Sequence, residues 1–116
     1  MSNPNVILEK LYPQEGFIQY ILNKSLLGGS DALEFQNELN DVLKSEEPNI
    51  IIFDLANTEQ INSSGLGMLV ASNSIVQRNG KSLVLINLPA KVKELVRMTH
   101  LDKVLKISDN LESALS

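Results

Sequence analysis

The sequence predicts an α/β fold in which helices pack on a mixed, mostly parallel β-sheet. Two observations carry this prediction. Short apolar segments of strand character alternate with longer segments whose apolar residues recur at helical spacing, and residues 50–55, Ile-Ile-Ile-Phe-Asp-Leu, form a nearly continuous apolar run. Such a run is typical of a central parallel strand buried on both faces. Strands that alternate with helices are joined by right-handed crossovers.

The N-terminal part of the chain predicts a hairpin followed by a helix. Apolar segments at residues 6–11 and 17–27 flank Pro13-Gln14-Glu15-Gly16, whose proline and glycine are typical turn residues. An antiparallel hairpin here makes the sheet mixed. Apolar residues then recur at helical spacing from Asp31, which forms a capping box with the glutamate three residues later, and Pro48 ends this helix region.

The remaining elements continue the alternation. After the strand at 50–55, a helix is expected from about Ser63 to Gln77, with Asn79-Gly80 as its stop. A strand at 81–87, a helix that begins at Pro89, a strand at 104–107 and a last helix capped by Asp109 and Glu112 should follow. The predicted order is ββαβαβαβα, in one domain that spans residues 1–116.

Composition excludes several classes of function. The chain has no cysteine and one histidine, so disulfides, thiolate catalysis and a Cys- or His-rich metal site are excluded, and no cofactor is expected. A net charge of −4 argues against nucleic-acid binding. No apolar run is long enough to span a bilayer, and the N-terminus lacks the features of a signal peptide, so we expect a cytoplasmic protein whose partner is another protein.

The most informative segment places two hydroxyl groups at the start of a helix. Residues 61–67 read Ile-Asn-Ser-Ser-Gly-Leu-Gly, directly after a strand and a polar turn. The first N–H groups of a helix have no partner within the helix, and the helix dipole is positive at this end. A phosphate added to Ser63, or alternatively to Ser64, would therefore be well accommodated, which makes this segment a candidate phosphorylation switch.

These residues resemble the STAS domain, the fold of bacterial anti-sigma factor antagonists. The resemblance covers nearly the whole chain and rests on Phe53-Asp54-Leu55, on the motif at residues 62–67 and on Gly80 before Leu-Val-Leu-Ile. It implies that Ser63 is phosphorylated by a cognate anti-sigma kinase. It also implies that the unphosphorylated protein binds the anti-sigma factor and so releases the sigma factor.

The chain departs from the family pattern at three places. Asn62 stands where the family has an acidic residue before the first serine. A second acidic position, after the second strand, falls near residues 27–29, Leu-Gly-Gly. The family's glycine before Leu101 is His100, which is tolerable if the position is left-handed, because histidine adopts that conformation more readily than most residues.

The resemblance also predicts a docking face and its partners. The expected partner is an anti-sigma factor/serine-protein kinase, with a phosphoserine phosphatase as a second partner, and the protein should be a monomer or a weak homodimer. The partner-binding residues should be Gly28, Gly29, Ser30, Asn62, Ser63, Ser64, Gly65, Leu66, Gly67 and Met68.

Other interpretations stay open at this point. Ser63 and Ser64 could be helix caps without a regulatory role, because serine is a favoured cap residue. The domain could also be a STAS scaffold that is not phosphorylated, or a ligand-sensing module in a signalling assembly, which Asn62 favours. A serine hydrolase would need His100 as the base and lacks the Gly-x-Ser-x-Gly motif, so no enzyme activity is expected. Asp54, a single carboxylate at a strand end, is most simply a loop cap.

Overall fold

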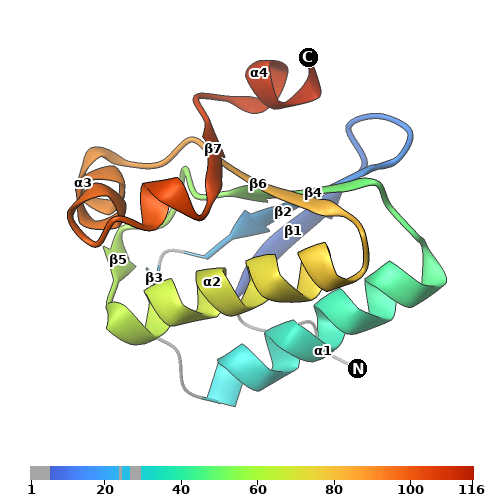
Figure 1. The fold of residues 1–116 in the computed structure, drawn as a ribbon, viewed down its shortest axis with the longest axis horizontal. Coiled ribbons are helices and arrows are strands. Elements are labelled where there is room, and N and C mark those ends of the chain that lie inside the picture. The colour runs from blue at the N-terminus through green and yellow to red at the C-terminus, as the bar shows by residue number, and fades with distance from the viewer. Residues whose placement is uncertain (1–5, 24, 27–29) are drawn as a thin grey trace.

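The computed structural model describes residues 6–23, 25–26 and 30–116, and it confirms the predicted α/β fold. Five strands form one sheet in the order β1-β2-β4-β6-β7 (Figure 1). β1 and β2 are antiparallel, and every other neighbouring pair in this sheet is parallel. The bounds are β1 Ile7–Leu11, β2 Phe17–Leu22, β4 Ile50–Asp54, β6 Ser82–Ile86 and β7 Lys106–Ser108.

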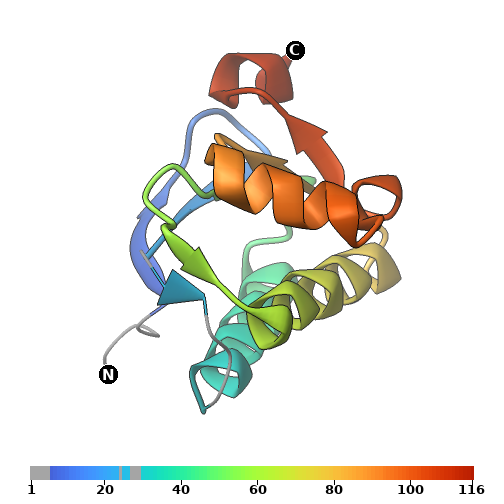
Figure 2. The same ribbon diagram turned by 90° about the vertical axis from the view of Figure 1, so that its left-hand side faces the viewer.

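The two long helices cover one face of this sheet. α1 (Ser30–Ser45) and α2 (Ser63–Arg78) lie side by side beneath it, as both views show (Figures 1 and 2). The chain then adds α3 (Ala90–Met98), a 3₁₀ turn η1 (Leu101–Lys103) and α4 (Leu111–Leu115), which lies against β6 and β7. The predicted starts near Asp31 and Ser63 agree with the structure to within one residue.

The core is centred on β4, as its apolar sequence predicts. Tyr20 from β2, Phe35 from α1 and Phe53 from β4 are fully buried and form an aromatic cluster. The ring centroids of Tyr20 lie 6.2 Å from those of both phenylalanines in edge-to-face geometry, and Phe35 and Phe53 are 5.1 Å apart. Such pairs add about 0.5–1.5 kcal/mol each beyond the burial of apolar area. The cluster therefore fixes α1 against the two strands.

The apolar run at 17–27 is not one strand, which corrects the prediction. β2 ends at Leu22, and β3 (Ser25–Leu26) pairs instead in parallel with β5 (Gln60–Ile61), forming a second, two-stranded sheet. The loop before β5 is held in place by Thr58, whose buried hydroxyl donates a hydrogen bond to the Asn23 carbonyl (3.0 Å). This contact between residues 35 positions apart lies where the chain passes from β2 to β3.

The C-terminal elements also differ in detail. The strand expected at 104–107 begins only at Lys106, because Leu101–Lys103 form η1 and the Leu105 N–H donates to the Leu101 carbonyl (2.8 Å). α4 is capped by Asn110, whose side chain accepts from the Ser113 N–H (2.9 Å), and not by Asp109. His100 has φ +61°, so the expected tolerance of a left-handed conformation at this position is confirmed.

Polar contacts join the hairpin to Glu38 of α1 and to Glu46, the residue that follows this helix. Lys10 donates a hydrogen bond to Glu46 (2.7 Å), and Tyr12 donates to the same carboxylate (2.7 Å). The Lys10 contact, followed by that of Tyr12, lowers the pKa of Glu46. The Tyr20 hydroxyl donates to Glu38 (2.9 Å), and burial, reinforced by the negative charge of Glu38, raises the pKa of Tyr20 well above its ordinary value.

Tyr20 predicts a loss of stability at alkaline pH. Because its pKa is higher in the folded state, its contribution is complete below the unfolded-state value of 10.0 and is lost as pH rises toward the folded-state value. In Tyr12→Phe, which retains Tyr20 as the only tyrosine, tyrosinate absorbance should increase only as the protein unfolds, while circular dichroism reports the fold. Tyrosinate in a protein that is still folded would contradict this account.

Candidate functional site

The start of α2 is fixed by Asn62, the residue before the two serines. Asn62 is extended (φ −119°, ψ −175°), and its side-chain oxygen accepts a hydrogen bond from the Gly65 N–H (2.9 Å). Its carbonyl accepts from the Leu66 N–H (2.9 Å), and its own N–H donates to the Leu26 carbonyl of β3 (3.4 Å). Asn62 is therefore the N-cap of α2, and it also ties the helix start to the small second sheet.

Ser63 and Ser64 are the first two residues of the helix and are not its caps. Both are exposed, and neither hydroxyl forms a hydrogen bond with a residue that the structure describes. Their backbone N–H groups also lack acceptors within the described residues, as expected of the first turn of a helix. The alternative that the serines serve only as caps is thus wrong, because Asn62 already fills that role.

Gly65 allows α2 to approach β3 more closely than any side chain would permit. A Cβ atom at this position would lie 1.9 Å from the Leu26 carbonyl oxygen and 2.9 Å from a side-chain carbon of Ile61. Gly67, two residues later, is exposed and has no atom within 4 Å of an added Cβ. The first glycine of the motif is therefore required by packing, whereas nothing in the described structure restricts the second.

The predicted docking face divides into exposed and buried residues. Asn62, Ser63, Ser64 and Gly67 are exposed, but Leu66 and Met68 are only 5% and 4% exposed and pack in the core. The expectation that these two side chains contact a partner is corrected, because both point to the interior of the domain. Gly65 is also buried. Gly28 and Gly29 lie outside the described residues, while Ser30 is the first residue of α1.

A carboxylate-centred network supports the loop that leads to this site. Asp54, at the end of β4, accepts hydrogen bonds from the Gln19 side chain (3.1 Å), the Ala56 N–H (3.0 Å) and the Asn87 side chain (3.2 Å). The network joins the middle of β2 to the ends of β4 and β6, and the Ala56 contact begins the turn that leads to Thr58. Asp54 is a loop cap, as predicted. Gln19, Thr58 and Asn87 were not predicted, since no local pattern distinguishes them.

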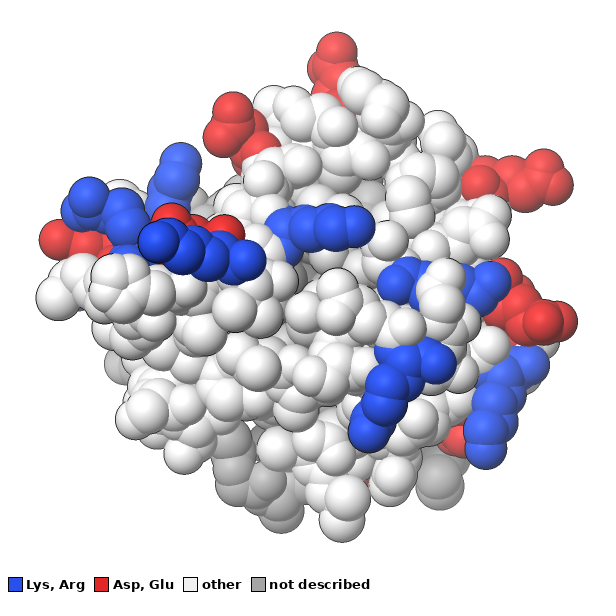
Figure 3. All heavy atoms as spheres, viewed as in Figure 1, with Lys and Arg blue, Asp and Glu red and all other residues white. Residues whose placement is uncertain are grey.

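The charges are distributed unevenly over the surface. Seven of the ten Lys and Arg residues fall within residues 78–106, whereas ten of the fourteen Asp and Glu residues precede residue 78. In Figure 3 the basic side chains gather over α3 and near the end of α2. Although the net charge of the chain is −4, residues 78–106 carry an excess of positive charge, which favours the binding of anions. The first turn of α2 itself carries no acidic residue that would oppose a phosphate.

The described residues contain no arrangement typical of hydrolytic or metal chemistry. No hydrogen bond links His100 to Ser63 or Ser64 within the described structure. In the same part of the chain, no group of three or more His, Cys, Asp or Glu residues could hold a metal ion. None of its helices has the length and apolar character that crossing a bilayer demands. The site is thus an exposed helix start whose two hydroxyls form no hydrogen bond with the described residues.

Comparison with known families agrees with this geometry. A family model described as the STAS domain matches residues 13–114, which is most of the chain. The chain belongs to the STAS domain family. Its match includes both the Asn62–Gly67 motif and the strand that precedes it.

Solved structures share the STAS fold at low sequence identity. A Thermotoga maritima protein classed as a candidate anti-sigma factor antagonist is 24% identical, with a TM-score of 0.75, over 88% of this chain and 86% of its own. The Bacillus cell fate determinant SpoIIAA in its phosphorylated form is 12% identical, with a TM-score of 0.68, over 92% of this chain and 95% of its own. A sulfate transporter family protein from Wolinella succinogenes is 18% identical, with a TM-score of 0.71, over 98% of this chain and 93% of its own. These matches establish the STAS fold.

The two glycines of the motif provide a matched test of this packing. Gly65→Ala should destabilise the STAS domain by about 1–3 kcal/mol or prevent folding, because the new methyl group overlaps the Leu26 carbonyl. Gly67→Ala should leave stability unchanged or raise it by about 0.5–1 kcal/mol, because alanine is the better helix former and has room. Urea denaturation measures both, and equal effects of the two substitutions would contradict the close approach of α2 to β3.

Proposed function

We propose that this STAS domain is an anti-sigma factor antagonist that binds an anti-sigma factor/serine kinase and is switched by phosphorylation of Ser63. The observation that carries the proposal is the pair of exposed serine hydroxyls at the first turn of α2, beside backbone N–H groups without acceptors among the described residues. Ser63 is the preferred phosphoacceptor because it directly follows the capping residue, as in the family motif. Ser64 is the alternative.

The fold should tolerate the phosphate, whereas an interface should not. A phosphoserine carries about −1.5 to −2 charges at neutral pH, and the helix dipole stabilises an anion at this position by about 0.3–1 kcal/mol. Burying the same charge against a partner without a basic group opposite it costs several kcal/mol. Phosphorylation therefore turns partner binding off while the domain stays folded.

The docking face that we propose is smaller than the sequence motif. It consists of the exposed residues Asn62, Ser63, Ser64 and Gly67, extended by the residues around the start of α1, including Gly28, Gly29 and Ser30. Leu66, Met68 and Gly65 contribute indirectly, because they hold the helix against the core and β3. Binding should thus depend on the position of the helix start more than on apolar side chains.

The wider setting follows from the same proposal. A phosphoserine phosphatase would return the domain to its binding state. We propose that residues 1–116 act as a single domain in the cytoplasm, as a monomer or weak homodimer, without nucleic acid, membrane or cofactor and without enzymatic activity of their own.

A second candidate is a STAS scaffold or ligand-sensing module that is not phosphorylated. Asn62 favours it, because the acidic residue of the family motif is absent while the cap is retained. The likeness to a sulfate transporter family protein fits this candidate as well, because it extends the fold beyond anti-sigma factor antagonists.

The switch predicts a defined phosphorylation product. A cognate anti-sigma kinase with ATP and Mg²⁺ should modify Ser63 in preference to Ser64, as measured by intact mass and peptide mapping. Ser63→Glu should weaken partner binding by about tenfold or more, because a charge must be desolvated. Its melting temperature should change by only a few degrees, and Ser63→Ala should bind constitutively.

Ser74→Glu is the matched control, since Ser74 is exposed on the same helix but away from its first turn. This variant should bind the partner as the unmodified protein does. Full partner affinity of Ser63→Glu, or phosphate on Ser64 alone, would refute the switch as assigned here.

Asn62→Asp tests the departure from the family motif. An aspartate retains the oxygen that caps Gly65 and adds a charge favoured by the helix dipole, so stability should rise by about 0.3–1 kcal/mol. The carboxylate also offers the Ser63 hydroxyl an acceptor, so phosphorylation by the same kinase should become faster. Equal rates for the two proteins would show that the carboxylate does not limit the reaction and that Asn62 is a cap alone.

A further inference from the structure

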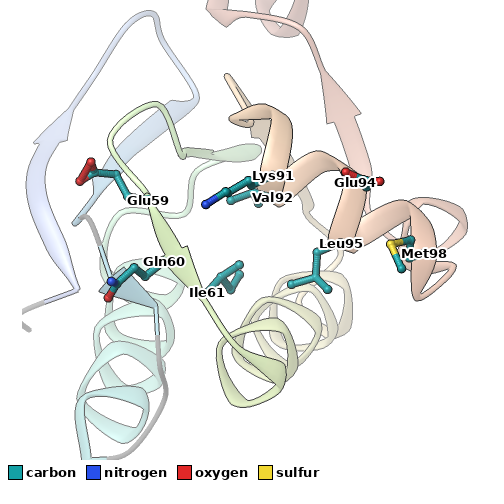
Figure 4. Close-up of a pocket in the computed structure, with 8 residues that line it drawn as sticks. All are labelled: Glu59, Gln60, Ile61, Lys91, Val92, Glu94, Leu95 and Met98. Carbon is teal, nitrogen blue, oxygen red and sulfur yellow. The ribbon is translucent and has the colours of Figure 1, made fainter.

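A groove of about 450 Å³ lies between β5 and α3, next to the candidate switch. Its walls are formed by the segment that leads into α2 and by the side of α3 that faces it (Figure 4). Ile61, Leu95 and Met98 give it an apolar lining, and Val92 lies buried at its base. Met98 is 67% exposed, so this apolar surface is open to solvent.

One basic side chain enters this groove. Figure 4 shows Lys91 extending from α3 toward β5, while Ile61 and Leu95 point into the same space. Glu59 is turned away from α3, and Glu94, which also lines the groove, is drawn well apart from Lys91. The lining thus contains one cation and the two carboxylates of Glu59 and Glu94, and of these three charged side chains Figure 4 shows only Lys91 extending between α3 and β5.

Lys91 is available for a ligand. Among the described residues only Lys10 forms ion pairs, so Lys91 has no carboxylate partner there. Lys93 and Arg97 are further exposed cations on α3, and such cations raise the local concentration of anions around this helix. A carboxylate or similar anion would gain a charge-assisted contact with Lys91 that no described protein group provides.

We propose that this groove binds a small organic monoanion with an apolar body, such as a medium-chain carboxylate. Lys91 would contact the anionic head, and Ile61, Leu95 and Met98 would pack against the body. The volume lies within the range of about 300–1,000 Å³ that is common for small-ligand sites. The bound molecule would touch Ile61, which immediately precedes the N-cap Asn62, yet this proposal does not require phosphorylation of Ser63.

The test uses octanoate as the probe, with 1-octanol and octylammonium as controls of the same chain length. Backbone amide NMR of the full chain should show octanoate-dependent shifts at Ile61, Lys91, Val92 and Leu95. Lys91→Met, which keeps a long apolar stem without the charge, should weaken octanoate binding about tenfold, because a charge-assisted contact is lost. Lys93→Met, which removes an exposed cation outside the groove lining, should weaken octanoate binding much less than Lys91→Met does, because Lys93 contributes only to the long-range field.

Several results would overturn the proposal. Equal binding of octanoate, 1-octanol and octylammonium would show that Lys91 selects no charge. Shifts that map away from the groove, or the absence of shifts at millimolar octanoate, would show that the groove is not the site. Shifts at the groove residues on simple dilution of the protein, without any probe, would identify a second copy of the chain as its occupant. None of these outcomes depends on whether a kinase modifies Ser63.

Discussion

The approach of α2 to the backbone of β3 is the constraint on which the functional surface depends. Gly65 lets the helix start lie against the Leu26 carbonyl, and the Asn62 N–H bonds to that same carbonyl. With the helix held there, Leu66 and Met68 point into the core and Ser63 and Ser64 point to solvent. The orientation of the two hydroxyls thus follows from the close approach of Gly65, the next residue in the chain, to the Leu26 carbonyl.

The sheet supplies the rigid base for this contact. Asp54 accepts hydrogen bonds from Gln19 in β2, from the Ala56 N–H after β4 and from Asn87 after β6, and Thr58 joins the following loop to the residue after β2. Both residues are buried, and a buried polar group without a hydrogen-bond partner lowers the stability of the fold. The hydrogen bonds of Asp54 and Thr58 therefore restrict the positions of their partners. The segment from β4 to α2 is therefore held at its start by Asp54, in its middle by Thr58 and at its end by Asn62.

This construction places two different surfaces next to each other. The start of α2 offers backbone N–H groups and hydroxyls, whereas the groove beside α3 offers apolar carbon and the Lys91 cation. β5 forms one wall of the groove and continues directly into the N-cap of α2. A molecule in the groove would therefore contact the same short segment that positions the switch, which gives the two proposals a common structural element but separate tests.

The sequence alone determined the features that local residues control. The apolar run at 50–55 identified the central strand, Asn79-Gly80 marked the end of α2, and the residues around Ser63 located the functional helix start. Only the tertiary structure decided that Asn62 is the cap, that Met68 is buried, and that residues 25–26 leave the main sheet to pair with β5. The physical reason is the range of the contacts. Helix and turn signals act between residues a few positions apart, whereas the second sheet and the Thr58 contact join segments 35 residues apart in the chain.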